Sequence, residues 1–138
     1  MRRFAGYAAI FDSPDTGGDI VRKGAFARGL ALRRAQGERE VLLLHQHDAA
    51  QRIGEVEHLS EDDRGLRVIA RVGDDTPVTP GTGLSFGYRV RGSRNGTYRE
   101  LTDLDLIEVS VVTRPMQPLA RVLAVQNTDQ PEGEDDEL

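Results

Sequence analysis

Gly83-Leu84-Ser85-Phe86-Gly87-Tyr88 is a short apolar stretch in which a serine stands between two glycines. If the stretch is a strand, alternation puts its three large side chains on one face and Ser85 with Gly87 on the other. Small residues beside a strand serine are typical of places where another backbone or a substrate comes close. Two glycines that relieve crowding at a bend of a sheet would give the same pattern.

The sequence around this stretch predicts a mostly β domain with a few helices. Two runs that alternate apolar and polar residues flank a polar turn at 60–65, and an Asn-Gly turn at 95–96 follows the serine segment, so each unit is expected to be a β-hairpin. A first strand at 4–11 and a short return strand at 19–21 indicate a further hairpin-like unit, and a helix is expected at about 26–35. We expect a small antiparallel β-barrel or sandwich.

Length and composition set the boundaries of this domain. The 138 residues contain no cysteine, which excludes disulfides, thiol catalysis and thiolate metal sites. Six carboxylates fall in 129–138 without a basic residue, and residues 1–128 hold 17 acidic against 18 basic side chains. We therefore expect a folded domain at 1–125 and a disordered acidic tail at 126–138.

Charge and hydropathy also limit the partners of the chain. The arginines are scattered and interleaved with acidic residues, which does not favour nucleic-acid binding. Apolar runs are too short to span a membrane or to serve as a secretory signal. The sequence predicts a soluble, intracellular protein.

Val41 to Asp48 contains two histidines, His45 and His47, at the end of an aliphatic run. As a strand, this run places both imidazoles on one face, where they could enter one cleft. This spacing fits a general base, and it also fits two ligands of a hydrolytic metal completed by Asp48 or Glu108.

Glu108 lies in a second strand-like run, from Asp103 to Val112. Continuing the alternation of Leu104 and Leu106 places Glu108 and Ser110 on the inward face. A buried carboxylate needs a partner, so Glu108 is expected to form a salt bridge with an arginine, to accept hydrogen bonds or to face a polar cleft.

These residues supply the parts of a nucleophilic hydrolase. Ser85 would be the nucleophile, His47 or His45 the base, and Glu108 the carboxylate that orients the imidazole. The order His, Ser, acid differs from that of the familiar serine proteases and α/β-hydrolases, and no helix follows the serine. A metal site built on both histidines would leave Ser85 without a role.

Five blocks of the chain, occurring in order over about residues 5 to 125, closely resemble the tailed-phage prohead maturation proteases. They are Gly6-Tyr7-Ala8-Ala9-Ile10-Phe11, Gly18-Asp19-Ile20-Val21 with Gly24-Ala25-Phe26, Leu44-His45-Gln46-His47-Asp48 with Ile53-Gly54, the serine segment, and Asp105-Leu106-Ile107-Glu108-Val109-Ser110 with Pro115-Met116.

The resemblance implies a serine endopeptidase with a fold related to the herpesvirus assemblins, a β-barrel ringed by helices. By motif, the catalytic residues would be His47, Ser85 and Glu108, although the assemblins use a second histidine in place of the acid. His45 stands where the family more often has an aromatic residue. Backbone amides after Ser85 or near Arg114 are candidates for the oxyanion hole, and no cofactor or metal is expected.

The resemblance also implies where such an enzyme works. In the host bacterial cytoplasm, inside the prohead of a phage or prophage, it would cleave the scaffolding segment of the major capsid protein and, in self-processing, its own chain. A homo-oligomer is expected. Family members usually carry a helix before the serine segment, and this chain has the short loop 76–82 in its place. The alternative is therefore a non-catalytic capsid-assembly module with the same fold.

Overall fold

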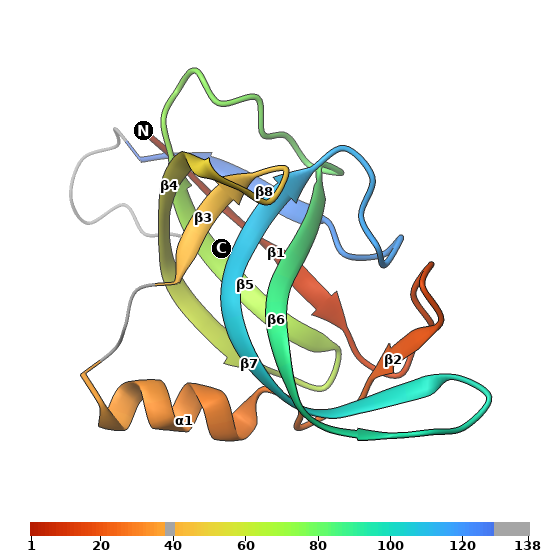
Figure 1. The fold of residues 1–138 in the computed structure, drawn as a ribbon. Helices are drawn as coiled ribbons and strands as arrows, with labels where there is room; N and C mark the ends of the chain where they lie inside the picture. The colour runs from red at the N-terminus through yellow and green to blue at the C-terminus, as the bar shows by residue number, and fades with distance from the viewer. Residues whose placement is uncertain (38–40, 129–138) are drawn as a thin grey trace.

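The computed structural model describes residues 1–37 and 41–128 (Figure 1). In these residues eight strands and one helix follow one another: β1 (Arg2–Ile10), β2 (Asp19–Val21), α1 (Ala27–Ala35), β3 (Leu42–His45), β4 (Asp48–Glu61), β5 (Gly65–Val72), β6 (Gly83–Arg94), β7 (Arg99–Val112) and β8 (Val122–Asn127). The predicted hairpins are confirmed as β4–β5 and β6–β7. Strand β8 extends two residues past the expected domain boundary, and 129–138 of the predicted tail lie outside the described residues.

All eight strands belong to one sheet, in the order β2-β7-β3-β4-β5-β1-β8, with β6 also paired to β7. The sheet is mixed, because β2 and β3 both pair in parallel with β7 and the other pairs are antiparallel. The expected hairpin-like unit is present only as an antiparallel return at 12–21, with an isolated bridge between Pro14 and Ile20, and β2 forms its ladder with β7 and not with β1. Asp15 Oδ1 accepts hydrogen bonds from the backbone N–H groups of Gly17 and Asp19, and this turn carries the chain past β1 toward β7.

The sheet curls around itself, so the start of β6 meets the segment that leads into β8 (Figure 1). Leu84 N donates a 2.8 Å hydrogen bond to Ala120 O, and Val122 N donates one of the same length to Thr82 O. Gly6 on β1 permits this approach, since a Cβ there would lie 2.4 Å from Arg121 O. The expected barrel is thus present as a curled mixed sheet. Its closure consists of a few hydrogen bonds between 82–84 and 120–122.

Helix α1 crosses one end of the curled sheet (Figure 1). The residue before it, Phe26, is 1% exposed, and its ring meets that of Phe86 on β6 edge-on at a centroid distance of 5.3 Å. Glu61 Oε2 accepts a 2.9 Å hydrogen bond from Phe26 N, which places a carboxylate at the helix N-terminus. The serine strand is therefore tied to the core through its apolar face, as the alternation predicted. At nine residues, α1 is too short to cross a bilayer, and no other helix occurs in the described ranges.

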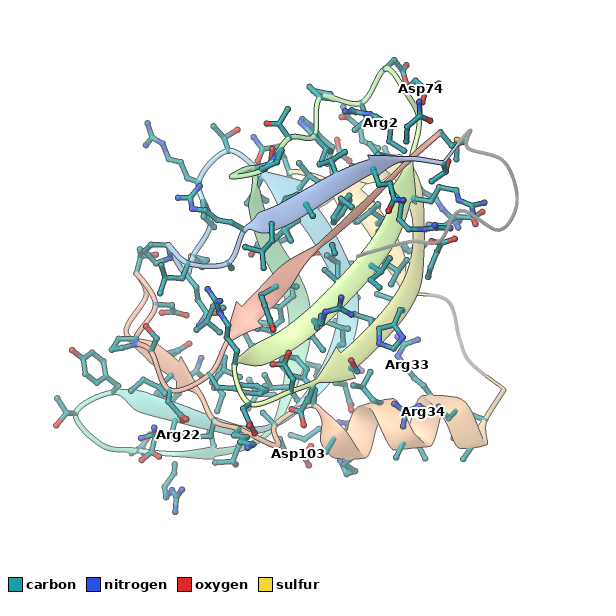
Figure 2. All side chains as sticks on the ribbon, turned by 180° about the vertical axis from the view of Figure 1, so that it is seen from behind. Arg2, Arg22, Arg33, Arg34, Asp74 and Asp103 are labelled. Atoms are coloured by element: carbon teal, nitrogen blue, oxygen red, sulfur yellow. The ribbon has the colours of Figure 1, made fainter. Side chains whose placement is uncertain are left out.

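Charged side chains lie over both ends of the molecule (Figure 2). Arg2 and Asp74 lie at the end away from α1, whereas Arg22 and Asp103 lie near the β6–β7 hairpin. Several of the arginines pair with carboxylates; Arg28, for example, contacts Asp103 Oδ2 at 2.8 Å.

Candidate active site

The pairing of β6 with β7 aligns the polar residues of the two strands. Ser85 pairs with Ser110 and Gly87 with Glu108, so these four residues share one face. This face is opposite to the core, which Leu84 enters from β6.

The inward face expected for Glu108 and Ser110 was wrong because β7 contains a bulge. Gly87 pairs with Glu108 while the next residue of β6, Tyr88, pairs with Leu106, so Ile107 is extra. The bulge reverses the alternation: Ile107 is 47% exposed, and the strand residues after it swap faces.

Glu108 is nevertheless only 6% exposed. The space for its side chain comes from Gly87, where a Cβ would lie 2.9 Å from Glu108 Oε1 and 3.0 Å from Cγ. Ser110 Oγ donates a 2.6 Å hydrogen bond to Glu108 Oε2. The expectation that this carboxylate has a partner is confirmed, and the partners are a serine and, at the other oxygen, a histidine rather than an arginine.

His47 lies in the two-residue turn between β3 and β4, not in the strand that we expected. Gln46 and His47 have φ angles of 52° and 60°, the positive values of a type I′ hairpin turn. His47 Nδ1 lies 2.5 Å from Glu108 Oε1, and His47 N donates a 3.1 Å hydrogen bond to Ser110 Oγ. Because an ionised carboxylate only accepts hydrogen bonds, Nδ1 carries a proton in this contact, and Nε2 takes no part in it.

Ser85 and His47 line the same hollow, which has a volume of about 330 Å³. Ser85 is 6% exposed, and the segment after β7 contributes Arg114 and Met116 to the rim. Across the described ranges no hydrogen bond joins Ser85 Oγ to the imidazole. Such contacts often tighten only when a substrate binds.

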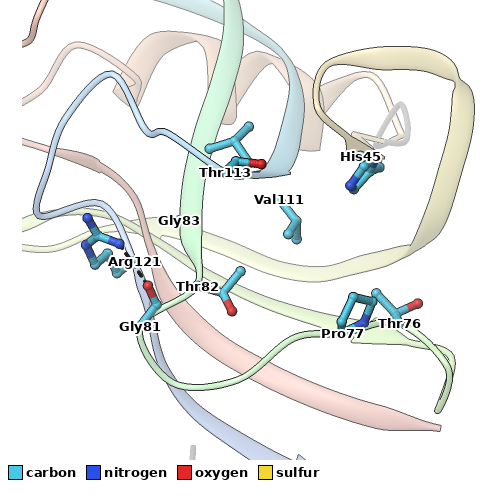
Figure 3. Close-up of a pocket in the computed structure, with 10 residues that line it drawn as sticks. His45, Thr76, Pro77, Gly81, Thr82, Gly83, Val111, Thr113 and Arg121 are labelled. Atoms are coloured by element: carbon cyan, nitrogen blue, oxygen red, sulfur yellow. Dashed lines mark hydrogen bonds between the residues drawn. The ribbon is translucent and has the colours of Figure 1, made fainter.

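His45 turns away from this hollow. It is exposed, its Nδ1 lies 3.1 Å from Gln51 Oε1, and it lines a neighbouring hollow of about 320 Å³ together with Thr82 and Arg121 (Figure 3). The two histidines therefore do not enter one cleft. In 1–37 and 41–128 no three histidine, aspartate or glutamate side chains gather as a metal would require, so the metal alternative finds no ligand set there.

Two glutamines hold the loops around the site in place, and the sequence analysis did not single them out. Gln46 Nε2 donates a 2.6 Å hydrogen bond to Thr113 Oγ1, and Gln46 Oε1 accepts one of 3.0 Å from Thr113 N. Gln117, 4% exposed, makes a similar pair of hydrogen bonds to the backbone N–H and C=O of Ile10. Gln46 lies within one of the five sequence blocks, and Gln117 directly follows another. A glutamine in a loop does not by itself indicate a structural role, so neither was predicted.

Three comparisons with known proteins agree with this picture. A family model described as caudovirus prohead serine protease matches residues 1–133. The prohead protease of Enterobacteria phage HK97 is 28% identical over 144 residues, which cover 91% of this chain and 61% of that protein. A crystal structure of KSHV protease in complex with a hexapeptide phosphonate inhibitor shares the fold, with a TM-score of 0.62 and 10% identity over 91% of this chain and 65% of that one. The chain thus spans less than two thirds of the length of either protein, and the herpesvirus likeness confirms the expected fold class.

Proposed function

Because the chain belongs to the caudovirus prohead serine protease family, as its ordered sequence blocks predicted, we propose that it is the serine endopeptidase of capsid maturation. Its substrate would be the scaffolding segment of the major capsid protein, cut inside the prohead. One observation supports this proposal most directly: a buried glutamate holds Nδ1 of a histidine that shares a hollow with a strand serine.

In this proposal His47 is the general base for Ser85. Glu108 fixes the tautomer with the proton on Nδ1, so the lone pair of Nε2 can take the proton of Ser85 Oγ as the oxygen attacks a peptide carbonyl. The tetrahedral intermediate then expels the amine, which leaves with the proton held on Nε2. Water, activated by the same nitrogen, releases the acyl group and restores the serine.

Glu108 supports the positive charge that appears on the imidazole during attack. It can do so because it is 6% exposed, so little water screens the carboxylate. Gly87, next but one to the serine, leaves the room that the Glu108 side chain occupies, and an extended peptide would reach Ser85 through the hollow that it shares with His47.

Co-expression with the major capsid protein of the same genome tests the proposal. Wild type should shorten the capsid protein, and Ser85→Ala, His47→Ala and Glu108→Gln should leave it intact. Ser93→Ala, on the exposed part of the same strand, is the matched control and should cut normally.

A second assay does not depend on the substrate. A fluorophosphonate probe should label Ser85 in wild type, as mass spectrometry of the labelled peptide would show. If wild type and Ser85→Ala leave the capsid protein equally uncut and neither is labelled, the protease proposal fails and the assembly module is favoured. Cleavage that survives Ser85→Ala and stops with a chelator would favour a metal hydrolase.

A further inference from the structure

Ser110 is a fully buried serine at the centre of the candidate site, yet it does not line the hollow that holds Ser85. It lies directly across from Ser85 in the β6–β7 pairing. A hydroxyl at 0% exposure must find partners within the protein, and Ser110 finds two.

The direction of these hydrogen bonds is fixed by chemistry. His47 N can only donate, so Ser110 Oγ accepts along the 3.1 Å contact. The hydroxyl proton is then free for Glu108 Oε2, 2.6 Å away. Glu108 Oε1 in turn accepts from His47 Nδ1, which closes a ring of three hydrogen bonds among the three residues.

This ring holds both functional groups at two points. The carboxylate of Glu108 is bound through both oxygens, which prevents its rotation about the last side-chain bond. His47 is bound through its backbone and through its ring. Since a residue other than glycine at a φ of 60° is strained, the hydrogen bond to His47 N also helps to keep the turn in place.

We propose that Ser110 is a positioning residue of the active site, acting through Glu108 and His47. This inference rests on the proposed function and extends it to a fourth residue. Ser110 does not line the hollow, and its hydroxyl bonds to Glu108 and to the backbone of His47, so its loss should lower kcat and leave KM nearly unchanged. Loss of one hydrogen bond to an ionised group predicts a fall in kcat of roughly 10- to 100-fold.

The experiment compares Ser110→Ala with Ser110→Thr, which keeps the hydroxyl oxygen. Thr should recover much of the activity that Ala loses, measured as the rate of fluorophosphonate labelling and of capsid protein cleavage. Ser60→Ala is the matched control, because Ser60 Oγ contacts a different histidine, His58, at 3.0 Å on β4. Ser110→Cys, close to serine in size, is used if Ala does not fold.

Amide hydrogen exchange gives a readout that does not depend on turnover. The N–H of His47 should exchange faster in Ser110→Ala, while that of Gln46, which donates to Val111 O at 2.9 Å, should keep its protection. A folded Ser110→Ala with wild-type kcat and unchanged exchange at His47 overturns the positioning role alone. A wild type that neither cuts nor is labelled overturns the proposed function, and the positioning role with it.

Discussion

Gly87→Ala tests whether the missing side chain at this position creates the place for Glu108. The new methyl group would lie 2.9 Å from Oε1, 3.0 Å from Cγ and 3.1 Å from Cδ of Glu108, too close at all three atoms. Strand pairing holds the backbone of Gly87, so the carboxylate has to move. It would then leave both His47 and Ser110.

The expected effect on activity is larger than the effect on stability. Overpacking and a displaced buried carboxylate should cost about 1 to 3 kcal/mol of unfolding free energy, since the carboxylate can turn toward water. If His47 is the base that we propose, loss of the carboxylate that orients it should lower kcat by about 10²- to 10⁴-fold.

Gly92→Ala on the same strand is the control for crowding alone. Its methyl group would lie 3.0 Å from Thr102 Oγ1 and 3.3 Å from Asp103 Cβ, away from the site. Denaturant melts measure stability, and steady-state cleavage at saturating substrate measures kcat. In a Glu108→Gln background Gly87→Ala should lower kcat little further. Equal kcat values for folded Gly87→Ala and Gly92→Ala would refute the reasoning.

Two further predictions concern stability. Gln117→Ala leaves the buried N–H and C=O of Ile10 unpaired and should lower the unfolding free energy by about 2 to 4 kcal/mol in denaturant melts; a loss below about 0.5 kcal/mol would contradict it. Hydrogen bonds from Arg91 and then Arg28 lower the pKa of Asp105, so its contribution is present above the unfolded-state pKa and is lost as pH falls through the folded-state pKa. Because both arginines are partly exposed, this contribution should be below about 1 kcal/mol. In acid titrations of stability, Asp105→Asn should flatten the curve over that range, and an unchanged curve would rule the contribution out.

The sequence predicted the local units of this fold because their signals are local. Alternation around polar turns identified the β4–β5 and β6–β7 hairpins, and the apolar face of the serine segment was placed correctly in the core. The parallel pairing of β2 and β3 with β7 could not be predicted, since it joins residues about 65 to 80 positions apart and leaves no periodic mark.

The face of Glu108 was mispredicted for a related reason. Ile107 is as apolar as its neighbours, so nothing in the sequence marks it as the extra residue of a bulge. The strand register predicted the wrong face for Glu108, whereas the cost of burying a carboxylate correctly predicted that Glu108 has hydrogen-bond partners. A carboxylate in an apolar run needs a partner on whichever face it lies, and the structure supplies two.

Three costly features meet in this small region of the molecule. Gly87 weakens the strand in which it lies. Gln46 and His47 both have positive φ angles, which are strained for residues other than glycine. The carboxylate of Glu108 is buried, which costs desolvation energy. Each feature would be selected against if stability alone mattered, and each is needed for the contact between His47 and Glu108. Replacement of Gln46-His47 by Asn-Gly, the preferred type I′ sequence, should therefore stabilise the turn while it removes the imidazole. A variant that became more stable and still showed the protease activity that we propose would show that these costs serve some other purpose.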